Sequence, residues 1–145
     1  MKTIRLRKPK NFNPRFEIVS CFCEYNGKFI LLHRRDHKPE GNTWGVVAGK
    51  KADFESIENA ILREALEETG IKLDKSILRY FRKVYVKFPT YDFIYHMFQY
   101  QLAARPEIRI NQNEHKAFAM VSPKESLRMN LISGLDECIR LFYQL

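Results

Sequence analysis

A chain of 145 residues with 45% hydrophobic and 29% charged side chains is expected to form one soluble domain, residues 1–145, around a single core. It contains no run of the roughly 18 apolar residues that a transmembrane helix requires, and no apolar segment follows the basic residues 1–10. We therefore expect neither a membrane protein nor a secretion signal, but a cytoplasmic protein. The formal net charge of +8 favours phosphorylated partners, either nucleotides or nucleic acid.

The excess positive charge is concentrated near the N-terminus. The basic side chains there are Lys2, Arg5, Arg7, Lys8 and Lys10. We predict a solvated, flexible basic arm over residues 1–12, because no aromatic residue that could stack on a base lies among the charges before Phe12. The alternative is an arm that contacts the phosphates of RNA or DNA.

The first half of the chain predicts a hairpin followed by a short strand. Strand-forming residues over Phe16–Tyr25 and Lys28–Arg34 flank Asn26-Gly27, a dipeptide typical of a two-residue hairpin turn. After these strands, we expect a polar loop over Arg35–Asn42, a short buried strand over Trp44–Val47 and a loop over Ala48–Phe54.

The second half predicts one long helix, three strands and two short helices. Ser56 can cap a helix that runs to about Thr69, where Gly70 favours the left-handed conformation typical of a helix C-terminus. Ser122-Pro123-Lys124-Glu125 combines a capping box with a proline at the first helical position, and Gly134 is expected to separate two short helices. The expected strands are Leu78–Phe88, Phe93–Ala103 and Ala117–Val121. This order indicates a mixed α/β fold.

The three cysteines are predicted to be buried thiols. An odd number of cysteines without a secretion signal argues against a disulfide framework. Cys21 and Cys23 would point to one face of a strand, but no nearby His or Cys completes a metal site around them. Free cysteine packs as a small apolar side chain, and we expect the same of Cys138.

The long helix has carboxylates where a buried face is expected. Its apolar stripe contains Ile57, Ala60, Ile61 and Ala65. Glu64 and Glu68 fall within that stripe, and Glu67 lies at its edge. Burying these charges is costly unless basic side chains neutralise them, the stripe opens into a cleft, or a divalent cation binds there. Because like charges crowd, we expect at least one of the three to have a raised pKa in the metal-free protein.

The same segment resembles the signature of a known family. Gly49 to Glu55, seven further residues, and Arg63 to Ile71 match the Nudix box. That pattern is Gly, five residues, Glu, seven residues, Arg-Glu, an aliphatic residue, any residue, Glu-Glu, any residue, Gly and an aliphatic residue. Every required Gly, Glu and Arg is at its position, so the chain resembles the Nudix hydrolases.

The resemblance implies a fold, a reaction and a set of site residues. The fold would be a Nudix-like α/β/α sandwich with a mixed sheet, and the reaction would be hydrolysis of a nucleoside diphosphate linked to another moiety. The cofactor would be Mg²⁺, with Mn²⁺ as an alternative. Arg63 and Glu55 would form a supporting catalytic pair, and Gly49 would let the backbone approach metal and substrate. The implied metal ligands and catalytic carboxylates are Glu64, Glu67 and Glu68.

Residues outside the helix extend the candidate site. Glu114 resembles an acidic position that the family often places near the metal, and it is a candidate ligand or general base, with a surface residue as the alternative. Lys50 and Arg34 are candidate substrate contacts, with solvated surface charge as the alternative. Trp44 and Tyr91 could stack on a base, but core packing is the alternative for both.

Two positions depart from the pattern of many family members. Val47-Ala48 stands where many members have Pro-Gly, and Phe54 stands where many have Gly before the first glutamate of the box. Neither change removes a ligand, but Phe54 would alter the loop beside the substrate.

We carry three functional hypotheses. The first is a metal-dependent pyrophosphohydrolase that cleaves a diphosphate bond in a nucleoside di- or triphosphate or a nucleoside diphosphate derivative, so that its partner is a phosphorylated, nucleotide-like small molecule. A carboxylate would take the proton from a water that attacks phosphorus in line. The second is an RNA 5′-end pyrophosphohydrolase, which the charge of +8 motivates. The third is a non-catalytic Nudix-fold nucleotide-binding module, which the intact Arg63 and box glutamates argue against.

Overall fold

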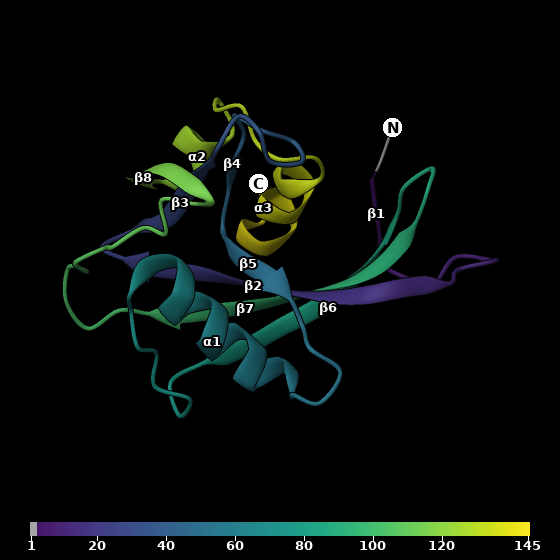
Figure 1. The fold of residues 1–145 in the computed structure, drawn as a ribbon, viewed down its shortest axis with the longest axis horizontal. Helices are drawn as coiled ribbons and strands as arrows, with labels where there is room; N and C mark the ends of the chain where they lie inside the picture. Colours follow the sequence, from purple (N-terminus) through teal and green to yellow (C-terminus); the bar gives the residue numbers. More distant parts are fainter. Residues whose placement is uncertain (1–2) are drawn as a thin grey trace.

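The computed structural model describes residues 3–145 and has one mixed sheet with helices on both faces (Figure 1). The strands are β1 (Ile4–Arg5), β2 (Pro14–Tyr25), β3 (Lys28–Arg34), β4 (Trp44–Gly45), β5 (Val47–Lys50), β6 (Arg79–Lys87), β7 (Asp92–Gln101) and β8 (His115–Val121). The helices are α1 (Ile57–Thr69), α2 (Pro123–Ser126) and α3 (Leu135–Tyr143). This arrangement confirms the mixed α/β fold that the order of elements predicted and the α/β/α sandwich that the resemblance implied. None of the helices in residues 3–145 is long and apolar enough to cross a membrane.

The sheet is built around the long strand β2. The main strand order is β1-β6-β7-β2-β3-β4, with β5 also paired to β2 and β8 paired to β3. Strands β2 and β7 run parallel from the pair Pro14 and Asp92 to the pair Glu24 and Gln101, and the other pairs are antiparallel. The hairpin turn forms as predicted, because Asn26 and Gly27 both adopt positive φ, 53° and 77°.

Alternate residues of β2 contribute to two separate cores. Val19, Cys21 and Cys23 pack in the core on the side of α1, whereas Phe22 packs in the core on the side of α3. A strand covered by helices on both faces is apolar at nearly every position, which explains the continuous apolar run in the sequence. The prediction of buried thiols is confirmed, since Cys21, Cys23 and Cys138 are all buried and free.

The ends of helix α1 follow local sequence signals. The Ser56 side chain accepts a hydrogen bond from the Asn59 amide at 3.0 Å, and Gly70 adopts a φ of 75° while its N–H donates to the Leu66 carbonyl. The predicted capping box at Ser122 is also present. These contacts place the start and end of the acidic helix where the sequence predicted them.

The segment after β4 differs from its prediction. Val47–Lys50 forms strand β5, although most of this segment was expected to be a loop, and the expected strand over Trp44–Val47 is divided at Val46. Strand β3 pairs with β2 only at Glu24 and Tyr25, which leaves the backbone of β2 free further back along the chain. Strand β5 satisfies those groups through pairs that run from Ile18 with Lys50 to Cys21 with Val47.

The basic N-terminal segment also differs in part from its prediction. Residues Ile4–Arg5 pair with β6 instead of forming a free arm, and the buried Ile4 joins the core on the side of α3. The Thr3 amide donates to the Glu137 carboxylate at 2.9 Å, which attaches this strand to α3. The side chains of Arg5, Arg7, Lys8 and Lys10 are exposed, as expected for solvated charges, and Lys2 lies outside the described residues.

Candidate active site

Arg63 on helix α1 lies at the centre of a network of carboxylates. Its guanidinium donates to Glu55 at 2.6 Å, to Glu64 at 2.8 Å and to Glu67 at 3.3 Å. It also donates to the Lys50 carbonyl at 3.1 Å, which ties the helix to the end of β5. A planar guanidinium with five N–H donors can hold several oxygens at fixed positions. Arg63 therefore forms the expected pair with Glu55 and also fixes the positions of the Glu64 and Glu67 carboxylates.

Glu55 joins the loop before α1 to the helix. Its carboxylate accepts from the Ala52 amide at 2.9 Å as well as from Arg63. The hydrogen bond from Arg63, followed by the one from Ala52, lowers the pKa of Glu55 below its ordinary value. Glu55 is therefore ionised at neutral pH and acts as a fixed anchor for Arg63.

Glu64 and Glu68 face the interior, while Glu67 faces solvent. Glu68 is 5% exposed, and its carboxylate accepts from the Ala48 amide of β5 at 2.9 Å. Burial raises the pKa of Glu68 well above the ordinary value, and the nearby charges of Glu64 and Glu114 add to the shift. Burial also raises the pKa of Glu64. The expected rise in pKa is present for both groups, but burial is a larger cause than the crowding of like charges.

Gly49 is required by the position of Glu64. A Cβ atom at residue 49 would lie 2.1 Å from the Glu64 carboxyl carbon, far closer than any non-bonded contact allows. Strand β5 can pass this close to α1 only because residue 49 has no side chain. Glycine therefore allows the backbone to approach the carboxylate cluster itself.

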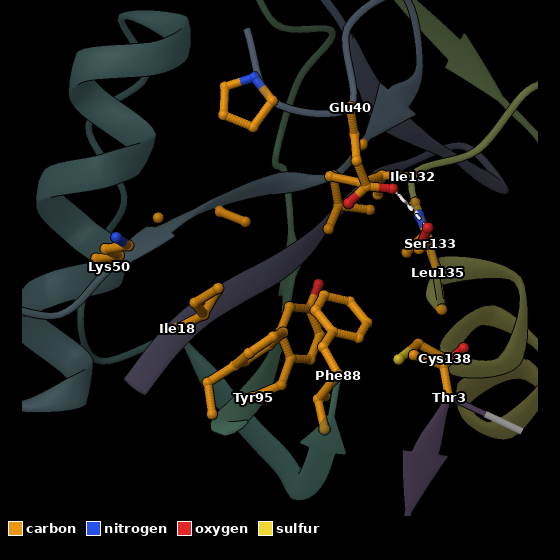
Figure 2. A pocket seen from close by; sticks show the side chains of 18 of the residues that line it. Thr3, Ile18, Glu40, Lys50, Phe88, Tyr95, Ile132, Ser133, Leu135 and Cys138 are labelled. Atoms are coloured by element: carbon orange, nitrogen blue, oxygen red, sulfur yellow. Dashed lines mark hydrogen bonds between the residues drawn. The ribbon is translucent and has the colours of Figure 1, made fainter. Parts of the chain in front are cut away.

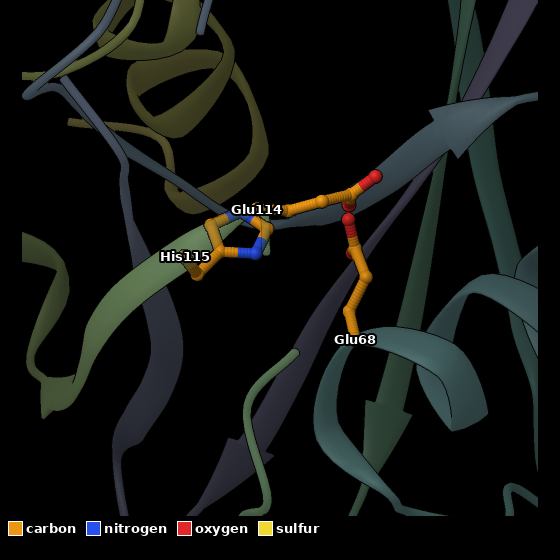
Figure 3. A group of neighbouring side chains, drawn as sticks. All are labelled: Glu68, Glu114 and His115. Atoms are coloured by element: carbon orange, nitrogen blue, oxygen red, sulfur yellow. The ribbon is translucent and has the colours of Figure 1, made fainter. Parts of the chain in front are cut away.

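The loop before β8 brings a further carboxylate and a histidine to the same place. Ligand atoms of Glu68, Glu114 and His115 lie within 4.8 Å of one another (Figure 3). The loop is held by the Glu114 carbonyl, which accepts from the Arg35 amide at 3.0 Å, and by the Glu114 amide, which donates to the Asn111 carbonyl at 3.0 Å. Glu114, a candidate from the sequence, thus lies beside Glu68.

His115 is the residue of this cluster that the sequence did not single out. It is 4% exposed, and its Nδ1 atom is buried without a hydrogen-bond partner within residues 3–145. Burial lowers the pKa of His115, so the ring is neutral near pH 7. Its position next to Glu114 was the only signal in the sequence, since a lone histidine in an apolar strand normally belongs to the core.

A cavity of about 660 Å³ extends from the cluster to helix α3. Figure 2 shows Leu135 and Cys138 at the α3 side of this cavity. Its end near the cluster includes Glu68, His115, Ala48 and Gly49, and the chain around α3 contributes Ser133, Leu135 and Cys138. Basic side chains in its wall are Arg15, Arg34 and Lys50, and aromatic side chains are Phe16, Phe88, Tyr91, Phe93 and Tyr95. Cationic groups and aromatic rings in one cavity suit a ligand that has both phosphates and a planar ring.

The candidate substrate contacts from the sequence divide between the cavity and the rest of the protein. Gly49, Lys50 and Arg34 line the cavity, and the Lys50 ammonium lies 4.4 Å from the centre of the Phe16 ring. Tyr91 also lines the cavity. Trp44 does not, because it stacks on His33 with a ring separation of 4.2 Å, in agreement with the packing alternative.

A comparison of the sequence with models of known protein families shows which family the chain belongs to. The model of the NUDIX domain family matches residues 14–142, which is nearly the whole chain. The chain belongs to the Nudix family. It is accordingly a hydrolase of phosphoric anhydride bonds that acts on pyrophosphate bonds in nucleotide derivatives.

Individual relatives of this Nudix hydrolase agree with the assignment. A CTP pyrophosphohydrolase from Escherichia coli strain K12 is 27% identical over 119 residues, which cover 79% of this chain and 82% of the relative. The MutT protein from Methanosarcina mazei Go1 superposes with a TM-score of 0.78 at 23% identity, covering 90% of this chain and 94% of that one. The bifunctional NMN adenylyltransferase/ADP ribose pyrophosphatase from Francisella tularensis, in complex with AMP and Mn ion, has a TM-score of 0.74 at 21% identity. That match covers 92% of this chain and 42% of that one.

Proposed function

We propose that this Nudix hydrolase is a divalent-metal-dependent pyrophosphohydrolase of nucleoside triphosphates or nucleoside diphosphate derivatives. The observation that carries the proposal is the buried Glu68, which lines a cavity with cationic and aromatic walls. The charges of Glu64 and Glu114 both act on the Glu68 carboxylate. The name of the Escherichia coli relative, CTP pyrophosphohydrolase, supports a nucleotide substrate.

The carboxylate cluster fits a hard divalent cation. Glu64 and Glu68 have raised pKa values in the absence of metal, and the negative charge of Glu114 contributes to the shift at both. A cation offsets both the desolvation of these groups and their mutual repulsion. Oxygen ligands on neighbouring turns of a helix suit Mg²⁺ or Mn²⁺, and Glu64, Glu67 and Glu68 are the residues that would hold the ion. When bound, the ion supplies charge neutralisation for the diphosphate and lowers the pKa of the attacking water.

The surrounding residues would bind and orient the substrate. Arg34 and Lys50 line the cavity and would neutralise phosphate oxygens. Aromatic side chains such as Tyr91 and Phe93 would pack against the base. Arg63 would keep the box glutamates in place through its contacts with Glu64 and Glu67, and is a positioning residue. Glu114 would accept the proton of the attacking water, since it lies beside Glu68.

The test is release of phosphate or pyrophosphate from a panel of phosphorylated compounds. The panel contains nucleoside triphosphates, dinucleoside polyphosphates, nucleotide sugars and 5′-triphosphorylated RNA, each with Mg²⁺, with Mn²⁺ and with chelator. We expect turnover of small nucleotides that requires metal and falls at least about 10²-fold in Glu68→Gln. Glu107→Gln, an exposed carboxylate outside the cavity, is the matched control and should retain wild-type turnover.

Two results would contradict the proposal. Turnover that persists in chelator would exclude the metal requirement, and absence of turnover for every small nucleotide would exclude the substrate class. Turnover of triphosphorylated RNA alone would instead favour the second candidate function, to which the exposed side chains of Arg7, Lys8 and Lys10 would contribute phosphate contacts.

A further inference from the structure

His115 has a ring nitrogen without a partner in a place where buried groups are normally paired. The residue is 4% exposed, and its Nδ1 has no hydrogen bond to any described residue. Burial of an unsatisfied nitrogen is unfavourable, and an apolar side chain would fill the same space without that cost. The unpaired Nδ1 therefore leaves the buried ring of His115 with a lone pair that a bound ligand can use.

His96, another buried histidine of this protein, has a hydrogen-bond partner for each of its ring nitrogens. His96 is 6% exposed, but its Nε2 lies 2.7 Å from the Glu17 carboxylate and its Nδ1 lies 2.9 Å from the Tyr80 hydroxyl. Both ring nitrogens of His96 have partners, as expected for a structural histidine. His115 therefore differs from this structural histidine in having an unpaired Nδ1.

The backbone directs His115 toward the cluster. Strands β3 and β8 pair His33 with Ala117 and then Arg34 with His115, so that the register shifts by one residue between these pairs. Such a bulge reorients the side chains around it and is frequent beside active sites. Figure 3 shows the result, with a nitrogen of the His115 ring on the side of the Glu68 and Glu114 carboxylates.

We propose that His115 is a nitrogen ligand of the metal site and gives it a preference for Mn²⁺ over Mg²⁺. This inference rests on the proposed metal-dependent function and adds a ligand outside the Nudix box. Two ligands of one ion, each bonded at about 2.1 Å, lie at most about 4.2 Å apart. Since the ligand atoms of Glu68 and His115 already lie within 4.8 Å of each other, small side-chain movements suffice for these two residues to share an ion, with Glu114 beside them as the proposed base.

The preference follows from the chemistry of the nitrogen donor. Mg²⁺ binds oxygen almost exclusively, whereas Mn²⁺ and later transition metals also accept a neutral imidazole. A site with only carboxylates discriminates weakly between Mg²⁺ and Mn²⁺. One imidazole ligand would increase the affinity for Mn²⁺ while leaving that for Mg²⁺ nearly unchanged.

The experiment is electron paramagnetic resonance of Mn²⁺ bound to the full-length protein, with detection of the coupling between the metal and ring nitrogen. Binding constants for Mn²⁺ and for Mg²⁺ in competition are measured on the same samples. The variants are His115→Phe and His115→Gln, and the control is His37→Gln, an exposed histidine in the loop after β3. Melting in chelator, compared with wild type, identifies variants that fold.

The wild-type protein and His37→Gln should show nitrogen coupling, and a folded His115 variant should lose it. The affinity for Mn²⁺ should fall about tenfold or more in that variant, with less than about a twofold change for Mg²⁺. Mn²⁺ binding to the wild-type protein without nitrogen coupling would overturn the role of His115 but not the proposed function. An unchanged ratio of Mn²⁺ to Mg²⁺ affinity in the folded variants would have the same meaning. Failure of the wild-type protein to bind either ion would overturn the proposed metal-dependent function as well.

Discussion

At the scale of single residues, the site depends on a few side chains that hold others in place. Arg63 contacts Glu55, Glu64 and Glu67 at once, while Glu55 in turn is anchored by the Ala52 amide. The positions of these residues in the sequence were predicted from the Nudix box. The pairing pattern was not, since spacing along a helix does not determine which oxygen each N–H of a guanidinium meets.

Replacement of Arg63 by lysine should show whether residue 63 acts by orienting the neighbouring carboxylates or only by its positive charge. An ammonium is a point charge that cannot hold three carboxylates at fixed angles, so Glu64 and Glu67 would lose their orientation. We expect kcat to fall about 10²-fold, because misplacement of catalytic groups by about 1 Å has that effect. The free energy of unfolding should fall by only about 1 kcal/mol or less, since the Arg63 side chain is 36% exposed. Full activity in Arg63→Lys, with exposed Arg105→Lys as the control, would exclude a positioning role.

The buried glutamates also make stability depend on pH in the metal-free protein. Burial raises the pKa values of Glu64 and Glu68 in the folded state, so the folded protein binds more protons than the unfolded chain between the ordinary and the raised values. The free energy of unfolding must therefore decrease as the pH rises through that window. Added Mg²⁺ replaces the protons, so the increase in melting temperature caused by Mg²⁺ should grow with pH. Thermal melts with Mg²⁺ and with chelator from about pH 5 to 8 measure this increase in melting temperature. An increase that becomes smaller as the pH rises would contradict the prediction.

At the scale of elements, features that depend on residues close in sequence were predicted, whereas features that depend on distant residues were not. The caps of α1 at Ser56 and Gly70 involve atoms close in sequence, and both were predicted. Strand β5 was not, because it forms only where β2 offers unpaired backbone groups about thirty residues earlier in the chain. The approach of β8 to α1, which brings His115 to Glu68, is likewise a property of the assembled sheet.

Because β5 passes close to α1, we expect that one methyl group added at residue 49 will lower both stability and activity. In Gly49→Ala, the new Cβ would overlap the Glu64 carboxyl carbon, so either the strand or the glutamate must move. We expect a loss of about 1–3 kcal/mol in the free energy of unfolding, with a reduction in kcat as Glu64 is displaced.

The matched control is Gly45→Ala on the preceding strand, where the nearest atom to a new Cβ would be a side-chain carbon of Ile132 at 3.6 Å. Its melting temperature should remain near that of the wild-type protein. Equal melting temperatures for both variants would contradict the prediction, since they would show that β5 or Glu64 can move without cost.

At the scale of the whole molecule, the sheet keeps two cores apart and leaves a cavity on the side of α3. The two-core sandwich could be predicted from the box and from the order of elements. The cavity could not, because its wall combines residues from the N-terminal strand, the end of β6, the start of β7 and the start of α3. The combination of side chains that line the cavity therefore arises only when the whole chain has folded.

The positive charge of the molecule should assist binding of anionic substrates. Arg15, Arg34 and Lys50 line the cavity of a chain with net charge +8, so added salt should raise KM for a nucleoside triphosphate. We expect kcat/KM to fall severalfold between about 50 and 300 mM salt, with kcat nearly constant. Steady-state rates over this range provide the measurement, and a salt effect confined to kcat would contradict electrostatic attraction.

The central claim is that the carboxylates around Glu68 form the metal site of a pyrophosphohydrolase. The most direct measurement is the rate of hydrolysis of the nucleotide that the substrate panel identifies, as Mg²⁺ or Mn²⁺ is added to the metal-free protein, for wild type and Glu68→Gln in parallel. The account predicts no rate in chelator, a rate that saturates with metal in the wild-type protein, and a rate lower by at least about 10²-fold in Glu68→Gln. A Glu68→Gln variant that folds and keeps the wild-type rate and metal dependence would contradict it.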